Sequence, residues 1–166
     1  MTDSLRIVEA QEKYFRSLTR TLNYVAGERQ YLSVNGGFTE YSTRAFYQNC
    51  KKNGFPQFYL IDENDSVVGW CDIVARDGKP RSVGYIGIGL MPDYRERGIG
   101  TRMMLYAMDK ARDAGFREIR LECRASNERA LHVYKKLGFK RTAYRRNGLI
   151  IDGERIPVVC MRKSLL

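Results

Sequence analysis

Residues 84–100 read GYIGIGLMPDYRERGIG: an apolar run, a proline turn and a glycine-rich opening of a helix. A strand that ends here passes into a helix with little side-chain bulk at the junction. The first backbone N–H groups of a helix have no partner within it, and the helix dipole places partial positive charge at the same end. The stretch therefore predicts a cradle for an anionic group such as phosphate.

Two familiar nucleotide-binding loops are excluded by the same stretch. No Gly-Lys-Ser/Thr follows the glycines, so it is not a P-loop, and no G-x-G-x-x-G opens the helix, which argues against a dinucleotide fingerprint. Gly98 and Gly100 would still let the backbone approach a pyrophosphate, although a tight turn with solvated arginines is the alternative interpretation. Positive charge around the glycines comes from Arg95, Arg97 and Arg102.

Length and composition fit one globular domain. A chain of 166 residues with 43% hydrophobic and 29% charged residues can bury a substantial core, so we expect a single domain over 1–166. The formal net charge of +10 indicates either a polyanionic partner or a solvated basic surface. Because neither an RNA-binding aromatic motif nor a zinc finger is present, nucleic acid is not the expected partner.

Location and metal content are constrained by what the sequence lacks. Its apolar runs fall short of the roughly 20 residues that a membrane span needs, and no secretion signal is visible. Cys50, Cys71, Cys123 and Cys160 are widely spaced without CxxC pairs, which fits reduced thiols, and a single histidine argues against a His-based metal site. We therefore predict a cytoplasmic protein without a membrane segment or a metal.

Hydrophobic periodicity and turn signals divide the chain into strands and helices. Strands are expected at 5–9, 57–62, 67–75, 83–91, 117–124, 139–146 and 155–163. Helices are expected at 11–26, 39–52, 98–114 and 127–137. The predicted fold class is α/β, of the mixed α+β kind: a mostly antiparallel twisted sheet of about seven strands flanked by about four helices, with a central βαβ unit.

A second group of polar residues follows the strand at 117–124. Glu122 alternates with apolar neighbours, so its side chain leaves the opposite face of the sheet from them. Asn127 opens the next helix, and Tyr134 lies about two turns further along on the same face. These side chains can converge on one cleft. The alternatives are a solvated glutamate and a tyrosine packed in the core.

The two groups, in this order, resemble the motifs of the GNAT superfamily of N-acetyltransferases. They are Arg95-x-x-Gly98-x-Gly100 after one strand, and Asn127, Tyr134 and Leu137-Gly138-Phe139 after the next. The resemblance covers about 100 residues, from about position 67 to the end. The stretch LECRASNERALHVYKKLGF is also similar to bacterial ribosomal-protein alanine acetyltransferases, which acetylate N-terminal amines. The remaining region, about 1–56, is expected to shape the acceptor side, and 57–166 to form the acetyl-CoA-binding core.

The resemblance implies that acetyl-CoA lies in a wedge between the strands that end at Met91 and Arg124. Its pantetheine arm would pair with the backbone at Ile88, Gly89 and Leu90. Its pyrophosphate would bind the amides of Arg95, Glu96, Arg97, Gly98, Ile99, Gly100 and Thr101. Asn127 would contact the pantetheine arm, and Tyr134 would approach the thioester sulfur.

The implied chemistry is direct transfer of acetyl to a primary amine, with no covalent intermediate. An amine has a pKa of about 8 at an N-terminus and about 10.4 in lysine, so it must lose a proton before it attacks. Glu122, directly or through water, is the candidate base, and Tyr134 would protonate the leaving thiolate. A backbone N–H near Leu90 would stabilise the oxyanion.

The acceptor is predicted less closely than the donor. A peptide or protein N-terminus and a small-molecule amine both fit, and the C-terminal resemblance favours the first. A catalytically silent acyl-CoA-binding sensor or interaction module is the alternative function, and a basic nucleic-acid-binding protein is the third. Homodimerisation is expected from analogy with the superfamily alone.

Several further positions have both a functional and a structural interpretation. Asp72 could face the acceptor, but a satisfied structural aspartate is the preferred interpretation. Cys123 lacks a histidine partner and is not expected to act as a nucleophile, and His132 is expected to be a surface or flanking residue. Tyr24, Tyr31 and Phe38 could line the acceptor pocket or pack in the core.

Overall fold

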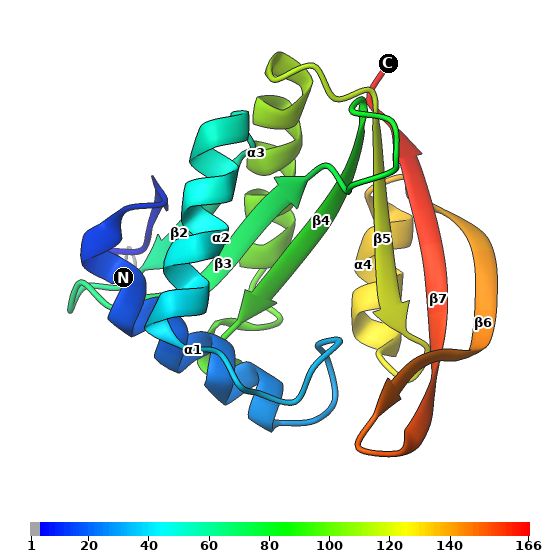
Figure 1. Cartoon of the computed structure of the whole chain (residues 1–166), viewed down its shortest axis with the longest axis horizontal. Coiled ribbons are helices and arrows are strands. Elements are labelled where there is room, and N and C mark those ends of the chain that lie inside the picture. The colour runs from blue at the N-terminus through cyan, green and yellow to red at the C-terminus, as the bar shows by residue number, and fades with distance from the viewer. Residues whose placement is uncertain (1–3) are drawn as a thin grey trace.

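The computed structural model describes residues 4–166, which form a seven-stranded sheet with helices on both faces (Figure 1). The strands are β1 (Arg6–Glu9), β2 (Gln57–Ile61), β3 (Val67–Val74), β4 (Val83–Leu90), β5 (Glu118–Arg124), β6 (Lys140–Ile151) and β7 (Glu154–Ser164). Their order is β1-β2-β3-β4-β5-β7-β6, and every neighbouring pair is antiparallel except β4 and β5. The predicted mixed, mostly antiparallel sheet is confirmed.

The helices begin and end close to the expected residues. In the described chain they are α1 (Phe15–Gly27), α2 (Glu40–Asn53), α3 (Ile99–Asp113) and α4 (Glu128–Lys136), with short 3-10 turns η1 (Glu12–Tyr14) and η2 (Pro92–Tyr94). Thr39 and Ser42 form a capping box at the start of α2, and Gly54 ends it with a φ of 69°. The first predicted helix differs at its start, because its first turn is the 3-10 turn η1.

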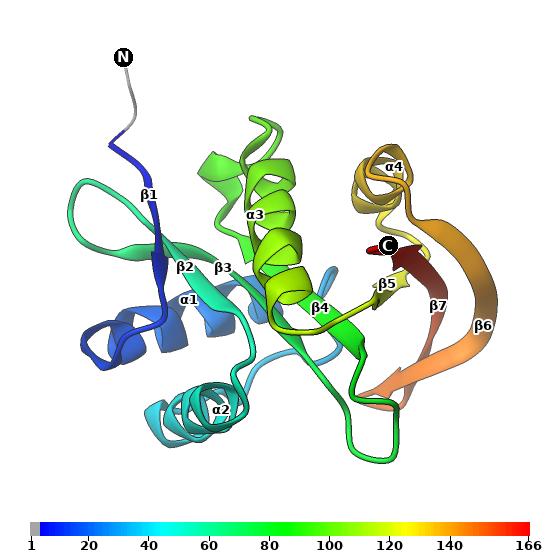
Figure 2. The ribbon, with the colours of Figure 1, turned by 90° about the horizontal axis from the view of Figure 1, so that it is seen from above.

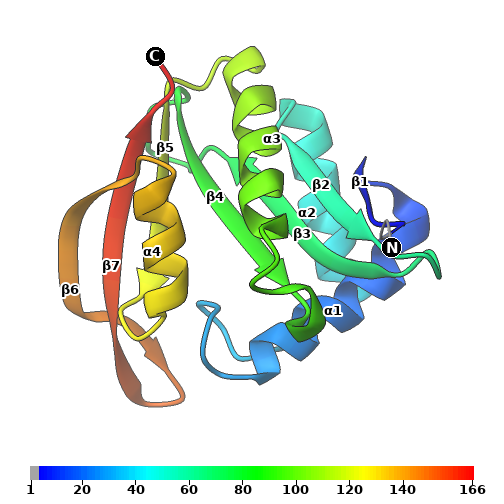
Figure 3. The same ribbon diagram turned by 180° about the vertical axis from the view of Figure 1, so that it is seen from behind.

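Two helices cover each face of the sheet. Figures 2 and 3 show α1 and α2 on one face and α3 and α4 on the other. The strands make this possible because successive side chains point to opposite faces. In β2, Tyr59 and Ile61 pack in the cluster with α1, whereas Phe58 and Leu60 pack in the cluster with α3.

The central strands β4 and β5 are paired at one end only. Their parallel pairing joins Val83, Gly84 and Tyr85 to residues 118–120 and ends there. Beyond Tyr85 the two strands diverge, as Figure 1 shows, while β4 stays paired with β3 up to Leu90. One edge of β4 over residues 86–90 therefore has no neighbouring strand. Its backbone N–H and C=O groups remain available to a ligand, except for the carbonyl of Leu90, which accepts a hydrogen bond from Arg95.

The last hairpin is longer than expected. The sequence predicts that the strand ends near Arg146, but β6 continues to Ile151 through a register shift between Arg145 and Leu149. A Cβ at Gly148 would lie 2.7 Å from the Cβ of Val158, so only glycine fits beside the partner strand there. An irregularity of this kind lets a strand continue across a polar stretch that otherwise resembles a turn.

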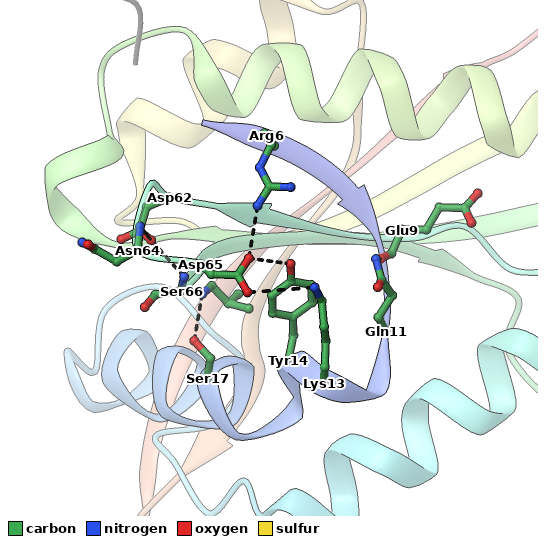
Figure 4. A network of polar contacts seen from close by, with 11 residues as sticks. Arg6, Glu9, Gln11, Lys13, Tyr14, Ser17, Asp62, Asn64, Asp65 and Ser66 are labelled. Atoms are coloured by element: carbon green, nitrogen blue, oxygen red, sulfur yellow. Dashed lines mark hydrogen bonds and ion pairs between the residues drawn. The ribbon is translucent and has the colours of Figure 1, made fainter. Parts of the chain in front are cut away.

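Figure 4 shows how the turn between β2 and β3 is attached to the start of α1. Asp65 accepts hydrogen bonds from the hydroxyl of Tyr14 at 2.8 Å and from Arg6 at 3.1 Å. The bond from Tyr14, and then the nearby cations, hold the pKa of Asp65 below its usual value. Ser17 accepts the backbone N–H of Val67 at 2.8 Å. These contacts fix α1 against the sheet on the face where the cavity opens.

Candidate functional site

A cavity of about 870 Å³ opens where β4 and β5 diverge. Its walls come from β2, β3, β4 and β5, from α1, α2 and the segment between them, from the first half of α3 and from α4. Most of the predicted site residues line it: Ile88, Gly89, Leu90, Arg95, Glu96, Gly98, Gly100, Thr101, Glu122, Asn127 and Tyr134. Arg97 and Ile99 are not among its lining residues, and the Ile99 side chain is buried in the core.

The start of α3 presents backbone donors to this cavity. Gly98 is the N-cap, with a φ of 73°, and no side chain caps the helix there. The first-turn N–H groups therefore stay available, and the helix dipole adds positive potential. Glu96, just before, also has a positive φ of 61°, which is unusual for a residue with a side chain. This geometry suits a phosphate group.

The side chain of Arg95 is engaged elsewhere. Its guanidinium donates to both carboxylate oxygens of Glu28, at 3.0 and 2.5 Å, and to the carbonyl of Leu90 at 3.0 Å. It also lies over the ring of Tyr31, 4.6 Å from the centroid. Hydrogen bonding to Glu28 raises the pKa of Arg95. The sequence predicts positive charge around the phosphate from this side chain, but the structure shows it tying the loop to the end of α1.

An ion pair connects the loop before α3 to α4. A guanidinium nitrogen of Arg129 lies 3.3 Å from a carboxylate oxygen of Glu96, and both residues line the cavity. Because both side chains are largely exposed, such a pair contributes at most about 1 kcal/mol. The pair bridges the two sides of the divided sheet, and Arg129 brings a cation close to the start of α3.

Asn127 and Tyr134 lie on the β5 side of the cavity. Asn127 caps α4 through its side-chain oxygen, which accepts the N–H of Ala130 at 3.3 Å, so its amide NH₂ remains a donor. The Tyr134 ring packs edge-on against Phe139, with ring centroids 6.0 Å apart. Burial raises the pKa of Tyr134, so its hydroxyl stays protonated at neutral pH.

Glu122 lines the cavity, but its carboxylate is paired with a cation. Its carboxylate lies 3.2 Å from a guanidinium nitrogen of Arg76, and that guanidinium stacks on the ring of Tyr85 at 3.8 Å. Tyr85 is the last β4 residue paired with β5. The ion pair therefore spans the apex of the wedge.

A second carboxylate lines the same cavity. Asp72 on β3 lies opposite Gly87 on β4, and no hydrogen bond or ion pair to its carboxylate is found among residues 4–166. Burial raises the pKa of Asp72 to about 7. The preferred interpretation of a satisfied aspartate is therefore wrong. The signal in the sequence was an acidic residue inside the otherwise apolar strand VVGWCDIV.

The segment between α1 and α2 is held in place by two residues from the other half of the sheet. Arg124 on β5 is buried, and its guanidinium donates to the carbonyls of Leu32, at 2.8 and 2.6 Å, and Arg29, at 2.8 Å. Asp152, in the β6–β7 turn, pairs with Arg29 at 3.0 Å and accepts from Asn35 at 3.3 Å. Nothing in the local sequence indicates these contacts. The segment's cavity-lining residues are Tyr31, Leu32, Ser33, Val34 and Phe38.

The cysteines and the histidine supply no competing nucleophile. The cysteines are free, and burial raises the pKa of Cys50 to about 12, that of Cys123 to about 11 and that of Cys71 well above its usual value. Neutral thiols are poor nucleophiles. His132 is exposed on α4 and does not line the cavity.

Residues 4–166 contain no cluster of three or more His, Cys, Asp or Glu side chains that could hold a metal ion. None of the helices in this part of the chain is both long enough and apolar enough to cross a membrane.

Comparisons with known sequences show where the chain belongs. The model of the Acetyltransferase (GNAT) family matches residues 19–139. A Bacillus subtilis protein, provisionally named a ribosomal protein bS18-alanine N-acetyltransferase, is 27% identical over 112 residues, 66% of this chain and 71% of that protein. The Escherichia coli K12 ribosomal protein bS18-alanine N-acetyltransferase is 37% identical over 60 residues, 36% of this chain and 40% of that enzyme. The chain thus matches less than half the length of the second relative.

Solved structures share the fold over nearly the whole chain. A phosphinothricin acetyltransferase from Sinorhizobium meliloti, solved with acetyl-CoA, has a TM-score of 0.88 at 20% identity and covers 99% of this chain and 89% of its own. The Brucella melitensis ribosomal-protein-alanine N-acetyltransferase has a TM-score of 0.88 at 17% identity, with coverage of 96% and 99%. By its sequence match over residues 19–139, the chain belongs to the GNAT family of acetyltransferases.

Proposed function

We propose that this protein transfers the acetyl group of acetyl-CoA directly to a primary amine. The observation that carries the proposal is the convergence, in one cavity, of the open β4 edge, the uncapped start of α3 and the Tyr134 hydroxyl. A relative solved with acetyl-CoA shares the fold, which supports the same donor here.

The donor can be placed by matching its chemistry to the protein groups. The backbone N–H groups at the start of α3 bind the pyrophosphate, with Arg129 nearby as a cation. The open edge of β4 at Ile88 and the N–H of Leu90 supply the donors and acceptors that the amides of the pantetheine arm need, because the Leu90 carbonyl is already bonded by Arg95. Because that arm runs from α3 back along β4, its thioester lies toward the apex of the wedge, between Tyr134 and the carboxylates.

The protein residues then carry protons rather than form covalent bonds. A carboxylate takes one proton from the ammonium, and the free amine attacks the thioester carbonyl. A C–N bond forms, the C–S bond breaks, and the electron pair leaves on sulfur. Tyr134 gives its proton to that sulfur, and the second proton lost from nitrogen passes through solvent to the Tyr134 oxygen, which restores the hydroxyl. A backbone N–H of β4 stabilises the oxyanion.

Glu122 stays the predicted base, acting directly or through water. Its pairing with Arg76 places a cation on the atoms that must accept a proton. If Glu122 is the base, Glu122→Gln should depress the rate most at low pH. A pH profile that does not change would show that another carboxylate acts as the base.

The acceptor is proposed as a protein or peptide N-terminus or a small-molecule amine. The bS18-alanine acetyltransferases among the relatives support the first, and the phosphinothricin acetyltransferase fold supports the second. The acceptor role of residues 1–56, a homodimer and a cytoplasmic location remain predictions.

Thiol release from acetyl-CoA tests the proposal directly. Purified protein is given acetyl-CoA with amino acids, polyamines, aminoglycosides, aralkylamines and short peptides, and free thiol is measured against a control without acceptor. We expect release with at least one amine and a matching acetylated product by mass spectrometry. Tight CoA binding without release for any acceptor would instead support the sensor or interaction module.

A further inference from the structure

Asp72 lies at the apex of the wedge, above the backbone of β4. It pairs with Gly87, two residues beyond Tyr85, where β4 and β5 part. Gly87 has no side chain, and a Cβ there would lie 3.1 Å from a carboxylate oxygen of Asp72. The carboxylate is therefore on the side of the sheet covered by α1 and α2, next to the part of β4 along which the thioester end of the donor is proposed to lie.

Asp72 has an unsatisfied neighbour. Gln57 on β2 is its antiparallel partner, is buried with 8% exposure, and lines the same cavity. The side-chain oxygen of Gln57 has no hydrogen-bond partner, while its nitrogen makes one long contact of 3.5 Å to the hydroxyl of Tyr59. Buried acceptors without donors are costly, so the two side chains together call for a ligand that donates hydrogen bonds. A primary ammonium has three such N–H groups.

The other acidic groups of the cavity already have cations. Among the described residues that line it, the carboxylates are Asp72, Glu96 and Glu122, and the last two pair with Arg129 and Arg76. Asp72 alone of the three faces the cavity without a guanidinium. An incoming ammonium is therefore drawn to Asp72 rather than to the neutralised pairs.

The titratable groups packed around Asp72 leave its charge uncompensated. They are Cys50 on α2, Tyr59 on β2 and the neighbouring Cys71, and each has a pKa raised by burial and by Asp72 itself. All three are neutral near pH 7, and β4 contributes only Gly87 at this point. Burial accordingly raises the pKa of Asp72 to about 7, which suits a base that works at neutral pH.

The side chains that line the cavity from α1, α2, the segment between them and β3 are mostly apolar. They include Leu18, Leu22, Phe38, Phe46, Trp70 and Val74, with Ser42 and Thr43 as uncharged polar neighbours, while the guanidinium of Arg76 is paired with Glu122. A second charged group on the acceptor would have no partner among these side chains. The chamber fits a primary amine attached to an uncharged, largely apolar body.

We infer that Asp72 is the group that binds the acceptor ammonium and takes its proton, with Gln57 orienting the nitrogen. The acceptor is then a primary amine next to an apolar group, such as an aralkylamine or the N-terminus of an apolar peptide. The inference rests on the proposed acetyl transfer and deepens it. One N–H bond breaks, the proton passes to the Asp72 carboxylate, and the nitrogen keeps the electron pair with which it attacks. Glu122 is then a positioning residue that holds Arg76.

The pH dependence of two variants decides between the carboxylates. We measure thiol release for wild type, Asp72→Asn and Glu122→Gln from pH 5.5 to 9, with phenethylamine and with an alanyl peptide amide as acceptors. In wild type, kcat/KM is expected to rise with pH through an ionisation near 7. In Asp72→Asn this rise with pH should disappear, and kcat/KM should fall about 100-fold. Glu122→Gln should keep the rise, which is the ascending limb of the pH profile. A limb that survives in Asp72→Asn and disappears in Glu122→Gln overturns the inference.

A binding measurement separates this inference from the proposed function. Calorimetry follows phenethylamine binding to the protein saturated with CoA, with Asp113→Asn, an exposed α3 residue outside the cavity, as the matched control. We expect affinity to fall at least about tenfold in Asp72→Asn and to stay unchanged in the control. Equal affinity in wild type and Asp72→Asn overturns the role of Asp72 even if thiol is released. Amine binding that depends on Asp72 without any thiol release overturns acetyl transfer instead.

Discussion

At the scale of single residues, the site is defined by how each polar group is satisfied. Tyr134 keeps its proton because burial raises its pKa. The negative charge of Glu122 is paired with the positive charge of Arg76. Asp72 has no partner and is left ready to accept a proton. The residue types alone do not distinguish the two carboxylates; their neighbours do.

Removing the hydroxyl of Tyr134 should slow the chemical step without weakening donor binding. In Tyr134→Phe the ring still packs on Phe139, but the thiolate must leave without its proton donor. We expect kcat to fall about 10- to 100-fold and the Kd of acetyl-CoA to stay within about twofold. Steady-state thiol release and calorimetry measure the two quantities. A kcat equal to that of wild type would remove Tyr134 from the acid role.

Asp72→Asn should stabilise the protein at neutral and alkaline pH. Burial raises the pKa of Asp72 to about 7, above the value of about 3.9 in an unfolded chain, so the native state binds the proton more tightly. Native stability therefore falls as pH rises from about 4 to 7, and the full penalty remains above 7. The amide of Asn carries no charge and avoids this penalty. The free energy of unfolding of the variant should therefore exceed that of wild type by about 1 to 3 kcal/mol at pH 7 and above.

Urea unfolding of wild type and Asp72→Asn at pH 4, 5.5, 7 and 8 measures this difference. The variant's advantage should grow with pH and level off above about 7. An advantage independent of pH would show that it comes from packing rather than from the carboxylate charge.

At the scale of elements, the loop between β4 and α3 depends on α1 for its shape. Arg95 joins the loop to Glu28 through a doubly hydrogen-bonded ion pair that is mostly shielded from water. The same guanidinium holds the carbonyl of Leu90, where β4 ends. The backbone donors of the loop are thus kept in position by a side chain that points away from the proposed phosphate.

Breaking this ion pair from either side should therefore have the same effect. Arg95→Met and Glu28→Met are each expected to lower the free energy of unfolding by about 2 to 4 kcal/mol. Both variants should also weaken acetyl-CoA binding, and to a similar extent. The double variant should cost less than the sum of the two, because one interaction is removed twice. Urea unfolding and calorimetry on the three variants measure these effects. If acetyl-CoA binding fails in Arg95→Met but not in Glu28→Met, the arginine binds the phosphate itself.

At the scale of the whole molecule, the sheet consists of two halves joined at one end. Strands β1 to β4 and strands β5 to β7 share only the three backbone pairs at 83–85 and 118–120. Contacts from Arg124 and Asp152 to the segment after α1 connect the halves again beside the cavity. This segment, which forms the proposed acceptor wall of the cavity, is thus held by both halves. The donor is proposed to lie between the two halves.

This architecture sets what could be predicted from the sequence. The order of elements and the anion cradle follow from local patterns, such as the strand, the turn and Gly98 over residues 84–100. The state of Asp72 could not be predicted, since it depends on Gln57 and on helices brought together from distant parts of the chain. The direction of the Arg95 side chain likewise depends on Glu28, which lies 67 residues away.

Because the two halves are joined in this way, a change in the β6–β7 turn should weaken binding of the acceptor and leave binding of the donor unchanged. Asp152 has a φ of 51°, a conformation that asparagine also tolerates, so Asp152→Asn removes the charge and keeps the turn. Because the pair with Arg29 is exposed, overall stability should change by less than about 1 kcal/mol. Loosening of residues 28–38 should speed their amide exchange and raise the acceptor KM about two- to fivefold, with acetyl-CoA affinity unchanged.

Hydrogen–deuterium exchange mass spectrometry, with Asp113→Asn as the control variant, measures this loosening. Unchanged exchange at 28–38 would mean that Arg124 alone holds the acceptor wall.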